Sequence, residues 1–386
     1  MKKKILFVIP SLKIGGIENA LINMLEHFDY EKFDVYVFVF HYDEAQVSRV
    51  DKRVHILKGG SLLNIVAMTM NDARAKGMGT ALIRAVLAVL CKALGSKSVF
   101  SVIYLFERKI KDMDIAVSYS NNVNTNSTYY GSNLFVLKKV KAPRKLAWLH
   151  VDYDAMEMDN DINNCEYRTF DGVVAVSDAV KDAFLKCNPE MKDKTYTVYN
   201  VLPKAFNSGF VAAIEKNKQT IVTVGRLDPN KNQLQCLEIA KKLVADGIDF
   251  KWYLVGDGQQ RIEVEEKIIR KRLEGIVEVT GYTLDVNKYL SGADIFVSTS
   301  LSESYGMSVV EAQAMGLPVV VKSYPAAKEI VDGTNGILVE DYEEMYQQIK
   351  MLLTDKDKYE ELKKNTKVLQ KDEESMKALY EMIGNI

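Results

Sequence analysis

The chain has 386 residues, 47% of them apolar and 27% charged, which excludes a disordered polypeptide and provides for more than one hydrophobic core. With 51 Lys and Arg against 52 Asp and Glu, the net charge of -1 gives no overall basicity for binding nucleic acid. The charge is uneven, however, since residues 1–205 carry a net +5 and the remainder a net -6.

The cysteines and the apolar runs restrict the cellular setting. The four cysteines are far apart and form no CxxC or Cys/His pair, so neither a zinc knuckle nor a redox dithiol is expected: Cys91, Cys165, Cys187 and Cys236. Too few apolar residues precede Pro10 for a signal peptide, and no apolar run reaches the roughly 18 residues of a membrane span. We expect a reduced, cytoplasmic protein.

Short apolar runs alternate with segments of helical period, the pattern of parallel sheets covered by helices on both faces. The first half predicts helices at residues 19–27 and 179–186, and strands at 4–9, 35–40, 115–118, 145–149 and 172–176. The second half predicts strands at 220–224, 250–255, 277–280, 295–298 and 318–321, and its last part, from Asp341, predicts a pair of helices covering one sheet. The fold class is therefore α/β, with two doubly wound sheets.

This pattern divides the chain into domains. We expect a first Rossmann-like domain at residues 1–205, a hinge at 206–218, where polar residues follow Pro203, and a second Rossmann-like domain at 219–368. Residues 369–386 are predicted to form a helix that crosses back to the first domain.

A helical insertion is expected at about residues 60–111, with apolar helical segments near 62–70 and 81–94. Eight basic residues lie between Arg74 and Lys111, whereas Asp72 and Glu107 are the acids from 72 to 111. Basic amphipathic helices can lie at the interface of a membrane with anionic lipid. Alternatively, the insertion packs on the first sheet and its charges are simply solvated.

Three glycine-containing turns follow predicted strands. Gly15 and Gly16 precede a helix. They would either let the backbone approach a phosphate bound at the helix N-terminus, or simply allow the strand and the helix to pack closely. Gly225 is followed by Arg226 and Lys231, which can grip a phosphate or remain solvated. The turn Gly256-Asp257-Gly258 is equally compatible with close approach to a nucleotide and with a plain turn.

The most informative segment follows the predicted strand at 295–298. Its loop carries Glu303 and Gly306, and a helix is predicted from about Ser308 to Met315, with Glu311 on its first turns. Both carboxylates can face one ligand at the helix N-terminus. Since carboxylates repel phosphate and accept hydrogen bonds, sugar hydroxyls are their expected partners.

The spacing Glu303-x7-Glu311, with Gly306 inside it and Gly316-Leu317-Pro318 after it, resembles the signature of family 4 retaining glycosyltransferases of the GT-B fold. Further pieces stand in the family's order: Gly15-Gly16-x-Glu18, Trp148-Leu149-His150, Gly225-Arg226-Leu227-x4-Lys231, Gly256-Asp257-Gly258 and Glu329-Ile330-Val331-x-Gly333-x-Asn335-Gly336. The resemblance covers residues 4–340 and is weakest between 42 and 140. One departure is Tyr324-Pro325-Ala326-Ala327 before Glu329, where many members have a Gly-Gly pair that lies close to the donor sugar.

The resemblance implies a role for each matching position. Two Rossmann-like domains would face each other across a cleft, the first binding the acceptor and the second the nucleotide sugar. Arg226 and Lys231 would bind the donor diphosphate, Glu311 the ribose and Glu303 a hydroxyl of the transferred sugar. His150 would assist the transfer, although a lone histidine after a strand is by itself more often structural. The remaining donor contacts would come from Gly15, Gly16, Gly306, Met307, Ser308 and Val309 around the phosphates, and from Gly256, Gly258 and Tyr282 around the base.

The function implied is a retaining transfer of a hexose from a nucleotide diphosphate sugar, with UDP favoured, to a hydroxyl of a glycan or lipid-linked glycan. Bacterial capsule, exopolysaccharide or other surface polysaccharide synthesis is the expected process, with no cofactor, no metal and no nucleic acid. A membrane-borne acceptor would bring residues 74–111 to the inner face of the plasma membrane. Two alternatives remain open: a nucleotide-sugar epimerase of the same architecture, and a non-catalytic nucleotide-sugar-binding subunit.

Overall fold

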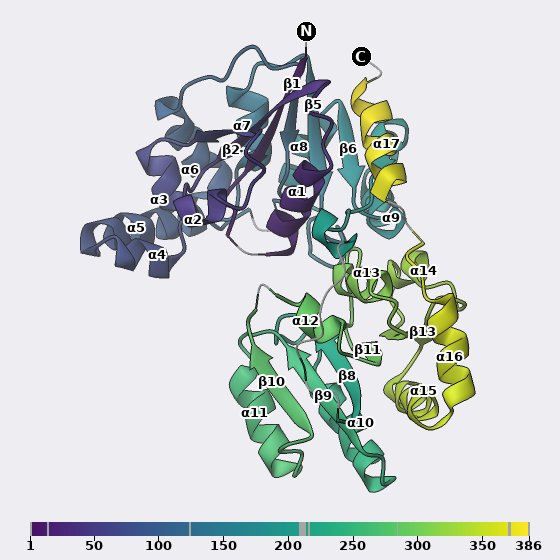
Figure 1. Cartoon of the computed structure of the whole chain (residues 1–386). Coiled ribbons are helices and arrows are strands. Elements are labelled where there is room, and N and C mark those ends of the chain that lie inside the picture. The colour runs from purple at the N-terminus through teal and green to yellow at the C-terminus, as the bar shows by residue number, and fades with distance from the viewer. Residues whose placement is uncertain are drawn as a thin grey trace. The chain divides into compact units, whose positions relative to one another are not determined.

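A computed structural model of the chain describes residues 2–13, 15–122, 125–207, 214, 217–283, 285–369 and 372–384 (Figure 1). The chain forms two compact units, each with its own sheet. Unit 1 comprises Met1–Pro203 and Asp372–Ile386, and unit 2 comprises Lys204–Lys371. Part of the predicted hinge, residues 208–213, 215 and 216, lies outside the described residues.

Unit 1 is built on a seven-stranded parallel sheet of order β3-β2-β1-β4-β5-β6-β7. The strands are β1 Lys3–Ile9, β2 Phe33–Val39, β3 His55–Lys58, β4 Ile115–Ser118, β5 Arg144–Leu149, β6 Gly172–Ala175 and β7 Thr195–Thr197. The apolar residues of β1 from Ile5 to Ile9 are fully buried, as expected of a central strand with both faces covered. All five strands predicted for this half are present, and β3 and β7 are additional.

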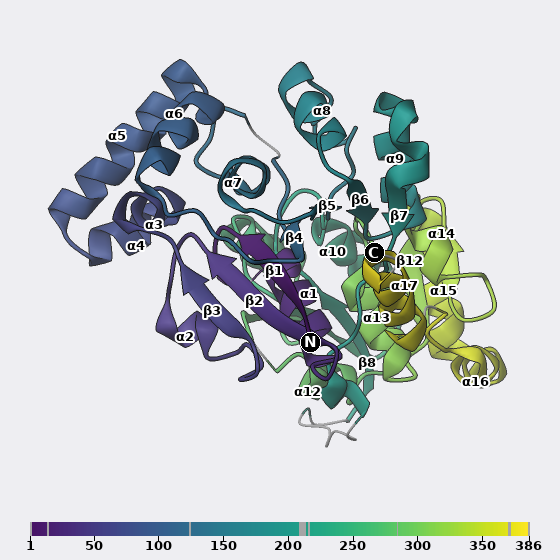
Figure 2. The ribbon, with the colours of Figure 1, turned by 90° about the horizontal axis from the view of Figure 1, so that it is seen from above.

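Helices cover both faces of this sheet. Because the strand order runs one way from β1 to β3 and the other way from β4 to β7, right-handed crossovers place α1 on one face and α7, α8 and α9 on the other. Figure 2 shows the last three side by side along the sheet. The bounds are α1 Gly16–Glu26, α2 Glu44–Val47, α7 Ser132–Lys139, α8 Asp161–Arg168 and α9 Asp178–Cys187, with a 3-10 helix η2 at Pro189–Lys194.

Between β3 and β4 the chain forms a helical insertion. Its elements are α3 Ser61–Ala67, α4 Met70–Ala75, α5 Met78–Leu94, α6 Ser96–Ile103 and the 3-10 helix η1 Tyr104–Phe106. Helix α5 packs on α3, α4 and α6. Both views place α5 at the outer edge of unit 1, away from the strands (Figures 1 and 2).

The end of the chain returns to unit 1 as α17 Asp372–Gly384. The hydroxyl of Tyr380 accepts a hydrogen bond from Asp29 N (2.6 Å) and donates one to His27 O (3.2 Å). Its ring stacks on Phe33 and meets Phe28 edge-on, each at 5.8 Å between centroids. After Asp341 the described residues thus form three helices, α15, α16 and α17. Two helices stay in unit 2, and a third packs on unit 1 because its apolar side matches Phe28 and Phe33.

Unit 2 has a six-stranded parallel sheet of order β10-β9-β8-β11-β12-β13. Its strands are β8 Gln219–Val224, β9 Phe250–Val255, β10 Val277–Gly281, β11 Ile295–Ser298, β12 Val319–Lys322 and β13 Ile337–Val339. Its helices are η3 Lys204–Asn207, α10 Leu234–Ala245, α11 Arg261–Arg270, α12 Asn287–Leu290, α13 Met307–Ala314, α14 Ala327–Ile330, α15 Tyr342–Thr354 and α16 Lys356–Asn365. Every strand predicted for this half is present, and β13 is additional.

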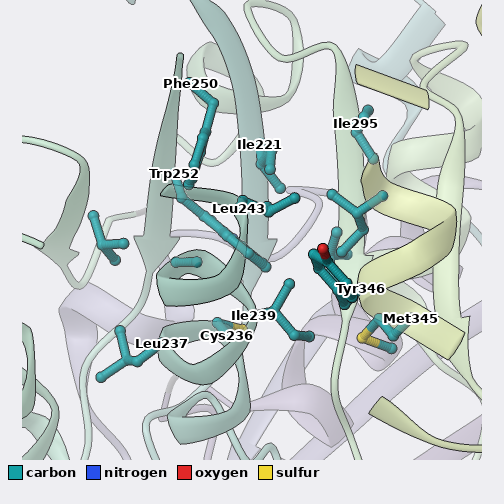
Figure 3. Close-up of a cluster of buried hydrophobic side chains, with 14 of the residues drawn as sticks. Ile221, Cys236, Leu237, Ile239, Leu243, Phe250, Trp252, Ile295, Met345 and Tyr346 are labelled. Carbon is teal, nitrogen blue, oxygen red and sulfur yellow. The ribbon is translucent and has the colours of Figure 1, made fainter. Parts of the chain in front are cut away.

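The core of unit 2 lies between the sheet and the helices α10 and α15 (Figure 3). Trp252 of β9 is fully buried there, and its ring nitrogen donates to the Thr223 hydroxyl at 3.1 Å. That hydroxyl in turn donates to Val297 O of β11 at 2.7 Å. The ring nitrogen of Trp252 and the hydroxyl of Thr223 are thus both hydrogen-bonded, and these bonds fix β8 between β9 and β11.

In both sheets the strand order reverses at one point, between β1 and β4 in unit 1 and between β8 and β11 in unit 2. Ligands of doubly wound folds bind outside the carboxyl ends of the strands at such a point. Among the helices of the described residues, none combines the length and the apolar run needed to cross a bilayer.

Candidate functional site

The loops after β8 and β11 meet at the point where the strand order of unit 2 reverses. The side chain of Asn230 donates to Ser302 O at 2.7 Å, and Leu301 N donates to Asn230 O at 2.8 Å. The hydroxyl of Thr299 donates to Lys231 O at 2.9 Å. These bonds hold the segment that carries Lys231 against the segment that carries Glu303.

Lys231 and Glu303 form an ion pair between these loops, with their side chains 19% and 16% exposed. The same carboxylate oxygen of Glu303 accepts a hydrogen bond from the Ser300 hydroxyl at 2.8 Å. A Cβ on Gly225 would lie 3.3 Å from Lys231 Cδ, so the stem of the lysine passes closely over the end of β8. The structure therefore brings together two residues that are 72 positions apart in the sequence.

Glu311 lies on the first turns of α13, and burial raises the pKa of its carboxyl to about 7, opposed by the positive charge of Lys231. A carboxyl with that pKa exists in both forms near neutral pH. It can therefore accept hydrogen bonds from hydroxyls as the anion and donate one as the acid.

The turn before α13 requires a glycine. Gly306 has φ +99°, in the left-handed region, and an added Cβ would lie 2.6 Å from the Tyr324 hydroxyl and 3.0 Å from Ile330 Cδ1. Met307, Ser308 and Val309 form the first turn that follows. The first amides of an α-helix have no intrahelical acceptor and carry partial positive charge, so this turn can hold an anion.

Tyr324 lies beneath this turn, and no motif had assigned it a role. Its hydroxyl is buried and has no hydrogen-bond partner among the described residues. Burial raises the pKa of this hydroxyl, and the negative charge of Glu303 raises it further. The segment Tyr324-Pro325-Ala326-Ala327 thus places an aromatic side chain directly against Gly306.

Arg226 lies apart from this cluster. Its side chain is 82% exposed, and its guanidinium is 3.4 Å from the carboxylate of Asp228. Such an exposed pair contributes little stability, so the side chain is free to turn toward a ligand. Asp228, which sequence reasoning did not select, also accepts a hydrogen bond from Lys231 N at 3.0 Å and so shapes the turn between the two cations.

Gly256 and Gly258 have a structural reason for being glycine. A Cβ on Gly256 would lie 2.0 Å from Gly225 O, and one on Gly258 would lie 2.4 Å from Leu227 O. The backbones of these two turns bond directly, with Leu227 N donating to Asp257 O at 3.0 Å. Their close approach accounts for both glycines whether or not a base lies nearby. Tyr282, which is 54% exposed, follows β10 beside this turn.

In unit 1, Gly15 and Gly16 lie at the start of α1. Nothing lies within 4 Å of where a Cβ on Gly16 would be, whereas one on Gly15 would meet the carboxylate of Glu18 at 2.4 Å. Burial raises the pKa of Glu18 to about 7, opposed by a hydrogen bond from its own backbone N–H and by the charge of Arg49. The carboxyl of Glu18 therefore occupies part of the position at the start of α1 where an anion was predicted to bind.

His150 follows β5 and is buried beside aromatic rings, with the Tyr119 centroid at 4.5 Å. Burial lowers its pKa to about 3, so the ring is neutral at physiological pH. Its backbone N–H donates to Asn121 Oδ1 at 2.8 Å, while His150 Nε2 and Asn121 Nδ2 are buried and unpartnered among the described residues. Asn121 was missed in the sequence, although its polar run directly follows the strand 115–118 at the reversal point of this sheet.

The structure thus brings Lys231, Glu303, Glu311 and the Gly306 turn together in unit 2, and it places Gly15, Gly16 and His150 in unit 1. Within the described ranges, no group of three or more His, Cys, Asp or Glu side chains is arranged to hold a metal ion.

Comparison with known proteins gives a family model and curated relatives that each match part of the chain. Residues 218–355 match the family model "Glycosyl transferases group 1". The poly(glycerol-phosphate) alpha-glucosyltransferase of Bacillus subtilis (strain 168) is 29% identical over 149 residues, which are 38% of this chain and 22% of that protein. The UDP-Gal:alpha-D-GlcNAc-diphosphoundecaprenol alpha-1,3-galactosyltransferase of Escherichia coli is 29% identical over 138 residues, 34% of this chain and 35% of that enzyme. The chain therefore spans well under half the length of these curated relatives.

Two solved structures match over the whole length of both chains. Anabaena HepE in complex with UDP and glucose superposes with a TM-score of 0.69 at 18% identity. A mutant of Staphylococcus aureus TarM in complex with Fondaparinux, alpha-GlcNAc-glycerol and UDP superposes with a TM-score of 0.68 at 15% identity. At such low identity these matches show the fold, and they confirm the prediction of a GT-B α/β fold.

Proposed function

We propose that the chain is a glycosyltransferase, since residues 218–355 match the family model "Glycosyl transferases group 1". In this proposal it transfers a hexose from a nucleotide diphosphate sugar to an acceptor hydroxyl with retention at the anomeric carbon. The observation that carries this proposal is the cluster at the reversal point of unit 2. There Lys231 pairs with Glu303, and its charge acts on the carboxyl of Glu311 in α13. One cation and a helix N-terminus suit the diphosphate, and two carboxyls suit the hydroxyls of a ribose and a sugar.

The leaving diphosphate gains negative charge in the transition state. Lys231 and the amides of Met307 and Ser308 would stabilise that charge from fixed positions, and Arg226 would turn in from solvent. Glu303 would exchange its contact with Lys231 for a hydroxyl of the sugar. In this scheme the leaving phosphate oxygen takes the proton of the acceptor on the same face, and His150 assists as a neutral hydrogen-bonding group. No metal ion is required for the diphosphate.

We further propose UDP as the nucleotide and a glycan or lipid-linked glycan of a bacterial surface polysaccharide, such as a capsule, as the acceptor. The support is that the Escherichia coli relative is named for a UDP-sugar donor and a diphosphoundecaprenol acceptor, and that HepE was solved with UDP and glucose. A lipid-linked acceptor would hold the enzyme at the inner face of the plasma membrane, where the basic segment 74–111 meets anionic lipid.

A thermal-shift screen against UDP-, GDP- and ADP-sugars, repeated in EDTA, tests the donor site. We expect a UDP-sugar to raise the melting temperature of the wild type with and without EDTA, and to have no effect on Lys231→Ala or Glu311→Ala. Lys242→Ala is the matched control, since it removes an equally charged residue of unit 2 that pairs with Glu343 on the surface. If the control and Lys231→Ala respond alike, the assigned donor site is wrong.

Transfer itself is tested by release of nucleotide. An acceptor-dependent release, with the new linkage keeping the anomeric configuration of the donor by NMR, supports the proposal. Turnover of the donor sugar without any acceptor would instead indicate the epimerase, and donor binding without turnover would indicate the binding subunit.

A further inference from the structure

Helix α5 turns its apolar side to solvent. Of the eighteen large hydrophobic side chains that are exposed among the described residues, ten lie between Met78 and Phe106. Five of these recur at the three- to four-residue spacing of a single helix side, and we call them the α5 face: Leu82, Val86, Val89, Leu90 and Leu94. Leu82, Val89 and Leu94 are 66%, 64% and 63% exposed.

The opposite side of α5 is anchored to the protein by a charged residue. The buried residues of α5 are Arg84 and Cys91. Arg84 Nε donates to Met68 O at 2.7 Å, and its guanidinium also donates to the Thr128 hydroxyl. A surface helix of a globular protein normally buries its apolar side. Because the hydrogen bonds of Arg84 fix the rotation of α5, the outward α5 face is a defined feature of the fold.

Uncompensated positive charge accompanies this face. No acidic residue lies between Asp72 and Glu107 in the sequence, and both of these are engaged, Asp72 with Lys13 at 3.0 Å and Glu107 with Gly60 N at 3.0 Å. Arg74, Lys76 and Lys92 are exposed and form no ion pair in the described parts of the chain, and the same holds for the basic residues just beyond η1: Arg108, Lys109 and Lys111. Leu105 and Phe106, which precede them, are also exposed.

We propose that the α5 face inserts into the headgroup boundary of an anionic bilayer, with the neighbouring lysines and arginines contacting the lipid phosphates. Apolar side chains flanked by cations are the pattern of a helix that lies in the plane of such an interface. A second copy of the chain is the less fitting occupant, because a symmetric contact would bring two uncompensated basic surfaces together. The inference rests on the proposed function in that it brings the enzyme to a lipid-linked acceptor.

Vesicle flotation of the full chain tests the inference. We expect binding to vesicles of phosphatidylcholine with phosphatidylglycerol and little binding to phosphatidylcholine alone. Val86→Glu with Val89→Glu, which replaces exposed side chains, should weaken binding about tenfold or more. Ile262→Glu with Ile269→Glu is the matched control, since these residues are comparably exposed on α11 of unit 2 and should bind as the wild type does. Replacing Lys76 and Lys92 by Gln should weaken binding about fivefold per charge.

An environment-sensitive dye reports insertion directly. The dye is attached to a single introduced cysteine after the accessible Cys165 and Cys187 have been changed to Ser. The emission of a dye on Val89→Cys should shift to shorter wavelength when anionic vesicles are added, whereas the emission of a dye on Ile262→Cys should not shift. Three results overturn the inference: no binding by the wild type, equal binding by Val86→Glu with Val89→Glu, or a dimer in sedimentation that these substitutions abolish. Donor-induced thermal shifts, measured on every variant, separate this failure from that of the proposed function.

Discussion

The carboxyl of Glu311 combines burial, a nearby cation and a helix N-terminus in one residue. Its pKa of about 7 in the folded protein stands above the 4.5 of the unfolded chain. A raised carboxyl pKa contributes stability that is fully present below pH 4.5 and is lost as the pH rises to 7. Near neutral pH the ionised carboxylate of Glu311 therefore lowers the stability of the folded protein. This is expected of a binding residue rather than a structural one.

Replacing this carboxyl should separate stability from binding. We expect Glu311→Gln to raise the free energy of unfolding of unit 2 by about 2 kcal/mol above pH 7, and to leave it nearly unchanged below pH 4.5. The same variant should lose its thermal response to the donor. Denaturant melts at the two pH values check this, and a variant that is less stable at the higher pH would contradict the burial argument.

His150 titrates in the opposite sense. Burial lowers its pKa from 6.5 to about 3, so its contribution to stability is present above pH 6.5 and is lost as the pH falls toward 3. We therefore expect the ring to stay neutral during turnover, and the pH–rate profile of the wild type to show no limb near 6.5 from this residue. We expect His150→Ala to lower the transfer rate about a hundredfold without changing the donor-induced thermal shift. A limb near 6.5 that vanishes in this variant would show a titrating imidazole instead.

At the scale of elements, Gly306 decides where α13 begins. We expect Gly306→Ala to destabilise unit 2 by about 2 kcal/mol, since the alanine meets both a positive φ and the Tyr324 hydroxyl at 2.6 Å. Donor binding should fall with it, because the first amides of α13 would move. Adding Tyr324→Phe, which removes the hydroxyl, should restore part of the stability. Calorimetry of the single and double variants measures this coupling, and strictly additive effects would rule it out.

The interior strands were predictable because both faces of a central parallel strand are buried, so each reads as a continuous apolar run. Strands β4, β9 and β11 were predicted at their observed bounds. Strands β3, β7 and β13 were missed because each lies at a sheet edge and has only three or four residues, such as Thr195–Thr197, too few to carry a pattern. Edge strands depend on pairing with a neighbour, which no local sequence signal records.

The site was predictable in part for a related reason. Lys231 and Glu303 both follow strands, and the adjacency of β8 and β11 brings them together. Other features of the site depend on three-dimensional packing and could not be predicted from residue spacing. They are the exposure of Arg226, the contact of Gly256 with the backbone of Gly225, and the position of Tyr324. The same limit applies to α5, whose apolar spacing was visible in the sequence while the side that the protein covers was not.

At the scale of the whole molecule, each unit has its own sheet and its own buried core. We therefore expect two thermal transitions, one for each unit. A nucleotide-sugar donor should raise the melting temperature of unit 2. Tyr380→Ala should lower the free energy of unfolding of unit 1 by about 3 kcal/mol, and with it the melting temperature of that unit. The reason is that the substitution exposes Phe28 and Phe33 and removes the hydrogen bonds to His27 and Asp29. Differential scanning calorimetry with and without donor tests both effects, and a single transition that both perturbations move would contradict independent units.

The return of α17 to unit 1 also bears on the order in which the chain is made. A ribosome releases the amino-terminal strands first, yet Phe28 and Phe33 remain uncovered until the segment Asp372–Gly384 emerges. Unit 2, whose elements are contiguous, has all of its parts outside the tunnel earlier. Unit 2 can therefore finish folding before unit 1, although its residues are synthesised later. This reverses the usual order of co-translational folding, in which amino-terminal domains fold first. During that interval the apolar surface around Phe28 and Phe33 is open to chaperones, so the segment Asp372–Gly384 protects unit 1 from misfolding once it has packed.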